Sequence, residues 1–65
     1  MLIDIDNISK KCSEKGLSIA QLERKSGLGN GTIGKWKSVL PRIDNVLAVA
    51  DVLGCTVYEL IKEEP

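Results

Sequence analysis

Hydrophobic residues recur at the three- and four-residue intervals of amphipathic helices along most of this chain. The first such run predicts a helix from about Asp4 or Asp6 to Lys15. Its apolar face would consist of Ile5, Ile8 and Cys12. Acidic residues at its start suit the positive end of the helix dipole, and Gly16 would end it.

The second run predicts two shorter helices joined by a tight turn. Ser18 and Gln21 have the spacing of a capping box, which marks the start of the first of them. Gly27 can adopt a positive φ without steric cost, so the chain can turn there into the second helix. Ile33 and Trp36, three residues apart, would pack that second helix against a core.

The outward side of this second helix, over about residues 30–37, carries little bulk. Its positions are small, polar or basic: Asn30, Gly31, Thr32, Gly34 and Lys35. A helix that is held by two apolar residues and has such an outward side suits insertion into a DNA groove.

Two further helices are predicted toward the end of the chain. One runs from Ile43 to Leu53, and Gly54 would end it. Its inward stripe would be Ile43, Val46, Leu47, Ala50 and Leu53. Thr56 and Glu59 repeat the capping-box spacing and would open a fifth helix. The inward residues of that helix would be Val57, Leu60 and Ile61.

No strand pattern, internal repeat or second domain is evident in the sequence. The expected fold is all-α: one compact five-helix domain over residues 4–62, with the two-helix motif at about 18–37 and a frayed tail at 63–65. A chain of 65 residues can bury one small core. Trp36 and Tyr58 are its two aromatic residues, so aliphatic side chains must build most of that core.

The motif and the segments after it match a known pattern. The matching positions are Leu17, Ser18, Leu22, Gly27, Leu28, Thr32, Ile33, Trp36, Pro41, Val46, Leu47, Ala50, Leu53, Gly54 and 56–61. At these positions the chain resembles the lambda-repressor/Cro family, also called the XRE family, of bacterial and phage DNA-binding regulators. The run Gly-Asn-Gly-Thr-Ile-x-x-Trp is typical of one branch of it. The resemblance implies a lambda-repressor-like domain with its helix at about 30–37 in the major groove of double-stranded DNA.

The net charge is zero, but the charges are unevenly distributed. Residues 10–42 contain eight basic and two acidic side chains, a local charge of +6, and the rest of the chain carries −6. The alternative explanation is an ordinary solvated surface. Because the positive half coincides with the helix-turn-helix, where DNA phosphates would be met, we favour a phosphate-binding role.

The resemblance implies that the opening positions of the third helix reach base edges. The expected base contacts are Asn30, Gly31, Thr32 and Lys35. Asn30 is the first candidate, because Asn can pair bidentately with adenine. Its alternative role is that of a helix-start residue that only satisfies backbone amides. Gly31 has no side chain to read a base, but it would allow a close approach of the backbone to DNA.

Phosphate contacts are expected from Ser18, Lys25, Gly34, Lys37, Ser38 and Arg42. For Ser18, the capping role is by itself a sufficient explanation. Where the family usually has Ala, at the crossing of the two helices, this chain has Glu23. A buried carboxylate needs a partner, and the amides of the third helix or Lys35 are the candidates.

Val49, Val52 and Tyr58 fall off the predicted apolar stripes. One explanation is scattered apolar surface, which is normal. The other is a dimer face for self-association on a two-fold operator, in solution or only on DNA.

Other classes of site find little support in the sequence. There is no His and no Cys-x-x-Cys, so we expect no zinc and no cofactor. Cys12 and Cys55 are expected as reduced thiols, because the chain has no secretory signal. No apolar run approaches a membrane span, no small-molecule ligand is evident, and a cytoplasmic location is expected.

The leading functional hypothesis is a sequence-specific DNA-binding transcriptional regulator, with repression as the expected role. The alternative is a protein-interaction module, an antitoxin-like or anti-repressor component that uses the same fold. An enzyme is not expected, because the chain offers no nucleophile–base pair, metal cluster or phosphate loop.

Overall fold

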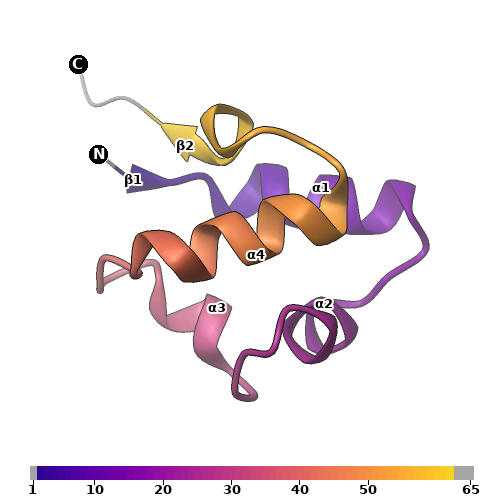
Figure 1. Cartoon of the computed structure of the whole chain (residues 1–65), viewed down its shortest axis with the longest axis horizontal. Coiled ribbons are helices and arrows are strands. Elements are labelled where there is room, and N and C mark those ends of the chain that lie inside the picture. The colour runs from indigo at the N-terminus through magenta and orange to yellow at the C-terminus, as the bar shows by residue number, and fades with distance from the viewer. Residues whose placement is uncertain (1, 63–65) are drawn as a thin grey trace.

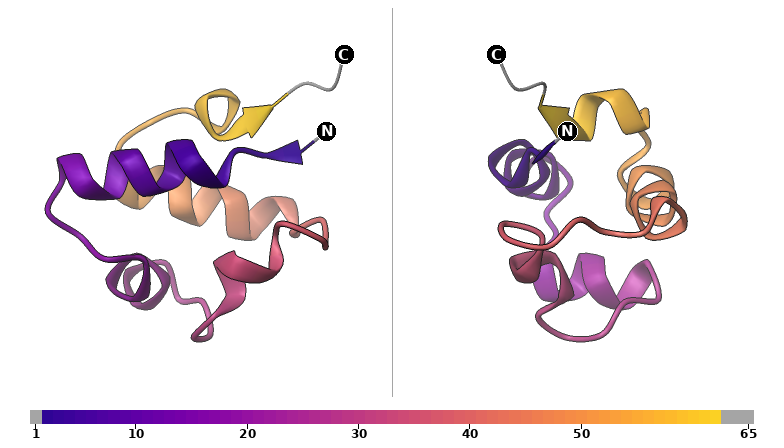
Figure 2. Two further views of the ribbon diagram at one scale, coloured as in Figure 1. Left: turned by 180° about the vertical axis from the view of Figure 1, so that it is seen from behind. Right: turned by 90° about the vertical axis from the view of Figure 1, so that its left-hand side faces the viewer.

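The computed structural model describes residues 2–62, so the frayed tail predicted at 63–65 lies outside the described residues. The elements in chain order are β1 (Leu2–Ile3), α1 (Ile5–Glu14), α2 (Ile19–Lys25), α3 (Thr32–Lys35), α4 (Ile43–Leu53), η1 (a 3-10 helix, Val57–Leu60) and β2 (Ile61–Lys62). In Figure 1, α1 and α4 cross the middle of the molecule, with α2 and α3 below them. η1 and the strands lie on the opposite side, as both views of Figure 2 confirm. No helix within residues 2–62 has the length and apolar character needed to span a membrane.

The core lies between these helices. α2 packs against α1, α3 and α4 from one side, and η1 packs against α1 and α4 from the other. The buried apolar residues are Ile3, Ile8, Cys12, Leu22, Ile33, Trp36, Val46, Val49, Ala50, Leu53 and Leu60. The predicted core position of Trp36 is therefore confirmed. Cys12 and Cys55 are free thiols, as predicted, and burial raises the pKa of both.

The boundaries of three predicted helices are confirmed by the groups that cap them. At the start of α1, the Asp4 carboxylate accepts a hydrogen bond from the Asn7 N–H at 3.0 Å. α2 begins with a complete capping box: Ser18 Oγ accepts from the Gln21 N–H at 3.1 Å, and Gln21 Oε1 accepts from the Ser18 N–H at 2.8 Å. α4 ends at Gly54, whose φ of 67° is readily adopted only by glycine.

The prediction of a fifth α-helix is wrong. The Thr56–Glu59 capping box is present, but it opens only the 3-10 turn η1. At Ile61 the backbone becomes extended, with φ −113° and ψ 136°, because β2 pairs antiparallel with β1. Strands of two residues are too short to show an alternating pattern, so they could not be predicted from the sequence. Within residues 2–62 the fold is mostly helical, with four α-helices and a two-stranded sheet.

The predicted inward stripe of α4 is also wrong in part. Ile43 is 60% exposed and Leu47 is 53% exposed, whereas Val49 is fully buried. α4 has apolar residues on nearly every side, so two adjacent stripes of apolar residues both have helical spacing. Contacts with α2 and η1 bury the stripe that contains Val49. Of the predicted dimer face, Val49 is therefore a core residue and Val52 is half-buried against the core. Only Tyr58 is highly exposed.

Substitution of the two aromatic residues should separate core from surface. Trp36→Ala should destabilise the fold by about 3–5 kcal/mol, which is most of the stability of a small domain. Tyr58→Ala is the matched control, since this ring is 85% exposed and its loss should change stability by less than about 0.5 kcal/mol. Thermal melts followed by circular dichroism would measure both. A normal melt for Trp36→Ala would contradict the burial of this ring.

Candidate nucleic-acid interface

The turn between α2 and α3 has the predicted geometry. Gly27 has a φ of 75°, which reverses the chain directly after α2. The Leu28 N–H then donates to the Glu23 carbonyl at 2.8 Å, and this bond ties the turn to the last turn of α2. The side chain of Leu28 is half-buried and packs on the core. The two helices are thus held in a fixed relation by the backbone as well as by packing.

α3 is shorter than the helix predicted at about 30–37, since it comprises only Thr32–Lys35. It cannot begin earlier because Gly31 has a φ of 83°, which lies outside the helical region. Asn30 and Gly31 therefore belong to the turn that precedes the helix. After Lys35, the Trp36 N–H donates to the Ile33 carbonyl and the chain leaves the helix.

The start of α3 is capped by a side chain of α2. Glu23 is 3% exposed, and its two carboxylate oxygens accept hydrogen bonds from one backbone amide at the cap position of α3 and one within α3. Oε1 accepts from the Gly31 N–H at 3.1 Å, and Oε2 accepts from the Ile33 N–H at 2.9 Å. Of the two predicted candidates for the partner of Glu23, the structure shows backbone amides at the start of the third helix and not Lys35. Because the residue at the cap position is Gly31 and the capping oxygens come from Glu23, Asn30 is not the helix cap.

Most predicted contact residues are accessible. The exposed ones are Ser18, Lys25, Asn30, Gly31, Gly34, Lys35, Lys37, Ser38 and Arg42. Thr32 is half-buried, and its hydroxyl donates to the Gly29 carbonyl at 2.7 Å. Since that proton is engaged, Thr32 can offer a ligand only its methyl group and its oxygen lone pairs.

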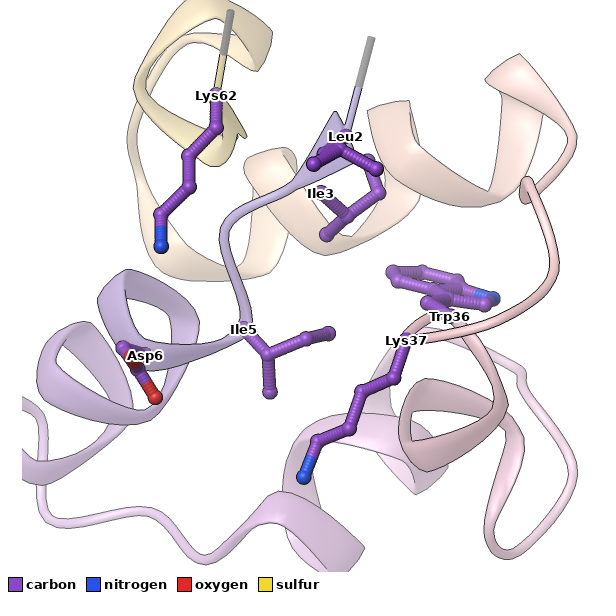
Figure 3. A pocket seen from close by; sticks show the side chains of 7 residues that line it. All are labelled: Leu2, Ile3, Ile5, Asp6, Trp36, Lys37 and Lys62. Atoms are coloured by element: carbon purple, nitrogen blue, oxygen red, sulfur yellow. The ribbon is translucent and has the colours of Figure 1, made fainter. Parts of the chain in front are cut away.

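The predicted phosphate contacts lie on separate parts of the surface. Ser18 is at the start of α2, and Arg42 is the cap residue of α4, where it pairs with Asp44 at 3.3 Å on open surface. Lys37 follows α3 and borders a hollow beside Ile5 and Trp36, in which its side chain extends away from the indole (Figure 3).

Lys25 does not line the hollow that Asn30 borders. It stands at the end of α2, where it borders a different hollow with Lys15, Leu17 and Val52. The structure instead places another basic residue near Asn30. Arg24 is exposed and borders a hollow together with Asn30 and Leu28. Arg24 was not among the contacts predicted from the sequence, although its position in the basic half was a usable signal.

Most basic side chains around α2 and α3 take part in no ion pair of the described residues. Within residues 2–62 the pairs are Lys11–Glu59, Arg42–Asp44 and Lys62–Asp4. The Thr56 amide, followed by Lys11, holds the pKa of Glu59 below its usual value. None of these pairs uses Lys35, Lys37 or Arg24, so among the described residues these cations are available to an anionic ligand.

Two helices joined by a tight glycine turn, with polar and basic groups exposed on the second, define a helix-turn-helix DNA-binding domain. The family model of the Cro/C1-type helix-turn-helix DNA-binding domain matches residues 7–65, and the chain belongs to this family. The resemblance stated from the sequence is confirmed. No curated protein and no solved structure matches the chain.

Two glycines of the interface should respond oppositely to alanine. At Gly34, inside α3, an added Cβ meets nothing within 4 Å, so Gly34→Ala should stabilise the domain by roughly 0.5–1 kcal/mol. At Gly31 the space is equally open, but the positive φ should make Gly31→Ala destabilising by about 1–2 kcal/mol. Urea titrations without DNA would measure both changes. Equal effects of the two substitutions would contradict the observed start of α3.

Proposed function

We propose that this chain is a sequence-specific transcriptional repressor that places α3 in the major groove of double-stranded DNA. The observation that carries the proposal is the exposed surface of α3 and of the turn before it, where Asn30 and Lys35 are exposed and Lys35, Lys37 and Arg24 form none of the ion pairs of residues 2–62. Membership of the Cro/C1-type family supports DNA as the partner. Occupation of a duplex site is enough to exclude another protein from it, which is why we propose repression.

In this proposal the base contacts come from the turn before α3 and from α3 itself. Asn30 pairs with adenine through its amide, and Lys35 reaches guanine or a phosphate. Thr32 contacts a thymine methyl group or accepts a hydrogen bond from a base amino group, since its hydroxyl proton is already donated. Gly31 allows the backbone to approach the base edges.

Phosphates would be bound at both ends of the motif. Ser18 keeps its hydroxyl proton free while Oγ accepts from the Gln21 amide, so it can still donate to a phosphate oxygen. The remaining proposed phosphate contacts are Lys25, Gly34, Lys37, Ser38 and Arg42. Lys25 would contact a phosphate further along the DNA backbone than the others. These contacts would orient the domain without reading sequence.

Base reading and phosphate binding should respond differently to substitution. Asn30→Ala should cost about 1–3 kcal/mol on the preferred duplex and flatten the preference at one base pair per half-site. Lys37→Ala should weaken all duplexes about equally and lower the slope of log affinity against log salt by about one per subunit. Titrations of both variants on the preferred duplex and its single-base-pair variants, at several salt concentrations, would measure this.

Two outcomes of these titrations would contradict the proposal. If Asn30→Ala weakened every duplex equally, Asn30 would read no base. If the wild-type chain showed no salt-dependent binding to DNA, the alternative of a protein-interaction module would replace the proposed function.

We also propose that two copies bind a two-fold operator, with half-sites about 34–36 Å apart. Since Val49 is buried, the dimer face predicted from Val49, Val52 and Tyr58 is not available as a whole, and we propose a different surface. Exposed apolar residues that follow α3 in the chain are Val39, Leu40, Ile43 and Leu47. They lie in the connector and on the exposed side of α4, close enough in the chain to α3 for one surface to set the spacing of two recognition helices.

A charged substitution on this surface should separate dimeric from monomeric binding. Leu47→Glu should abolish the concentration-dependent cooperativity on a full two-fold site and leave the affinity for a single half-site unchanged. Tyr58→Glu is the comparison, because Tyr58 is the exposed remainder of the face predicted first. Footprinting and sedimentation with duplex DNA would measure both variants. Loss of cooperativity in Tyr58→Glu alone would assign the dimer face to η1 instead of α4.

A further inference from the structure

α3 cannot set its own position. It has four residues, about one helical turn, which is far below the length at which a helix is stable alone. Its cap residue is glycine, which has no side chain to bind the first amides. The orientation of α3 must therefore come from contacts with the rest of the domain.

Two kinds of contact are available for this. Ile33 and Trp36 are buried in the core and anchor the inner side of α3. The other contact is the buried Glu23 carboxylate, whose two oxygens bind the Gly31 and Ile33 amides. The Gly31 bond reaches the turn that carries Asn30, which the apolar anchors do not.

We propose that Glu23 is a positioning residue for DNA recognition, which fixes the turn at Asn30–Gly31 and the start of α3 relative to α2. This inference rests on the proposed function. Bonds from backbone amides to a carboxylate are shorter and stronger than bonds between neutral groups, and two of them restrict rotation as well as distance. Asn30 is part of this turn, so a shift of the turn would move the proposed base-reading amide away from its base.

The same contact changes how the start of α3 can meet DNA. The amides of Gly31 and Ile33 are already occupied, so they are not free to bind a phosphate. Glu23 is also the one acidic residue between Lys15 and Arg42 in the sequence. Its charge beneath a DNA-binding surface is offset by the two N–H groups that point at it.

Glu23→Gln removes this arrangement while it keeps the size of the side chain. Its amide group has one acceptor oxygen and one donor nitrogen, so one of the two backbone amides would face a donor instead of an acceptor. Glu59→Gln is the matched control. It makes the same change of charge at a carboxylate that also caps a helix, where Glu59 Oε2 accepts from the Thr56 N–H at 2.8 Å, on the side of the molecule opposite to α2 and α3.

The measurement is the ratio of the dissociation constants for an unrelated duplex and the preferred duplex, at one salt concentration. Partial unfolding lowers both affinities by the same factor, so a merely structural role leaves this ratio unchanged. The ratio for Glu23→Gln should fall about fivefold or more, as expected when one base contact is misplaced. The ratio for Glu59→Gln should stay within about twofold of the wild type.

Other results would overturn the proposal. A ratio for Glu23→Gln within about twofold of the wild type, beside a lowered melting temperature, would show that Glu23 only stabilises the fold. An equal fall in Glu59→Gln would assign the effect to charge.

If Glu23→Gln does not fold, Glu23→Asp carries the same test, since it keeps the charge and withdraws the carboxylate by one methylene. A wild-type chain without sequence preference would overturn the proposed function itself, whereas a wild-type preference that both Glu23 variants retain would overturn the role of Glu23 alone.

Discussion

The carboxylate of Glu23 between α2 and α3 is the contact on which the geometry of the helix-turn-helix depends. It is 3% exposed and binds the two amides that a one-turn helix with a glycine cap cannot satisfy itself. A buried carboxylate without such bonds would be strongly destabilising, and so would the buried Ile33 amide without an acceptor. Each group therefore requires the other, and this mutual requirement ties the second helix of the motif to the first.

The rest of the chain divides into a structural side and a side left open for a ligand. At the structural side, β1 pairs with β2, η1 packs on α1 and α4, and the Lys11–Glu59 and Lys62–Asp4 pairs join chain segments that are far apart in the sequence. On the side of α2 and α3, the cations Lys35, Lys37 and Arg24 take part in none of the ion pairs of residues 2–62. Although the net charge of the chain is zero, its basic side chains are concentrated in residues 10–42, which suits a polyanionic ligand.

The sequence predicted those parts of the fold that depend on local chemistry. Asp4, Ser18 and Gly54 mark helix ends through their own side chains or backbone conformation, so their roles could be predicted without the tertiary structure. For Glu23 the sequence narrowed the partners to the amides of the third helix or Lys35, because a buried carboxylate needs a donor, and the structure selects the amides.

Features that depend on contacts between distant segments were missed. The pairing of Ile3 with Ile61 fixes the end of η1, and strands of two residues leave no periodic signal. The rotation of α4, which buries Val49 and exposes Leu47, is set by α2 and η1 because the helix is apolar on several sides. Arg24 was overlooked because its proximity to Asn30 arises only when the turn folds back.

The central claim is that the turn at Asn30–Gly31 and α3 form the DNA-facing surface. Amide chemical shifts recorded during titration with the preferred duplex test it most directly. The largest changes should occur over residues 29–38 and at the start of α2, with little change in β1 and β2. Large changes in β1, β2 or η1 with residues 29–38 unaffected would contradict the account.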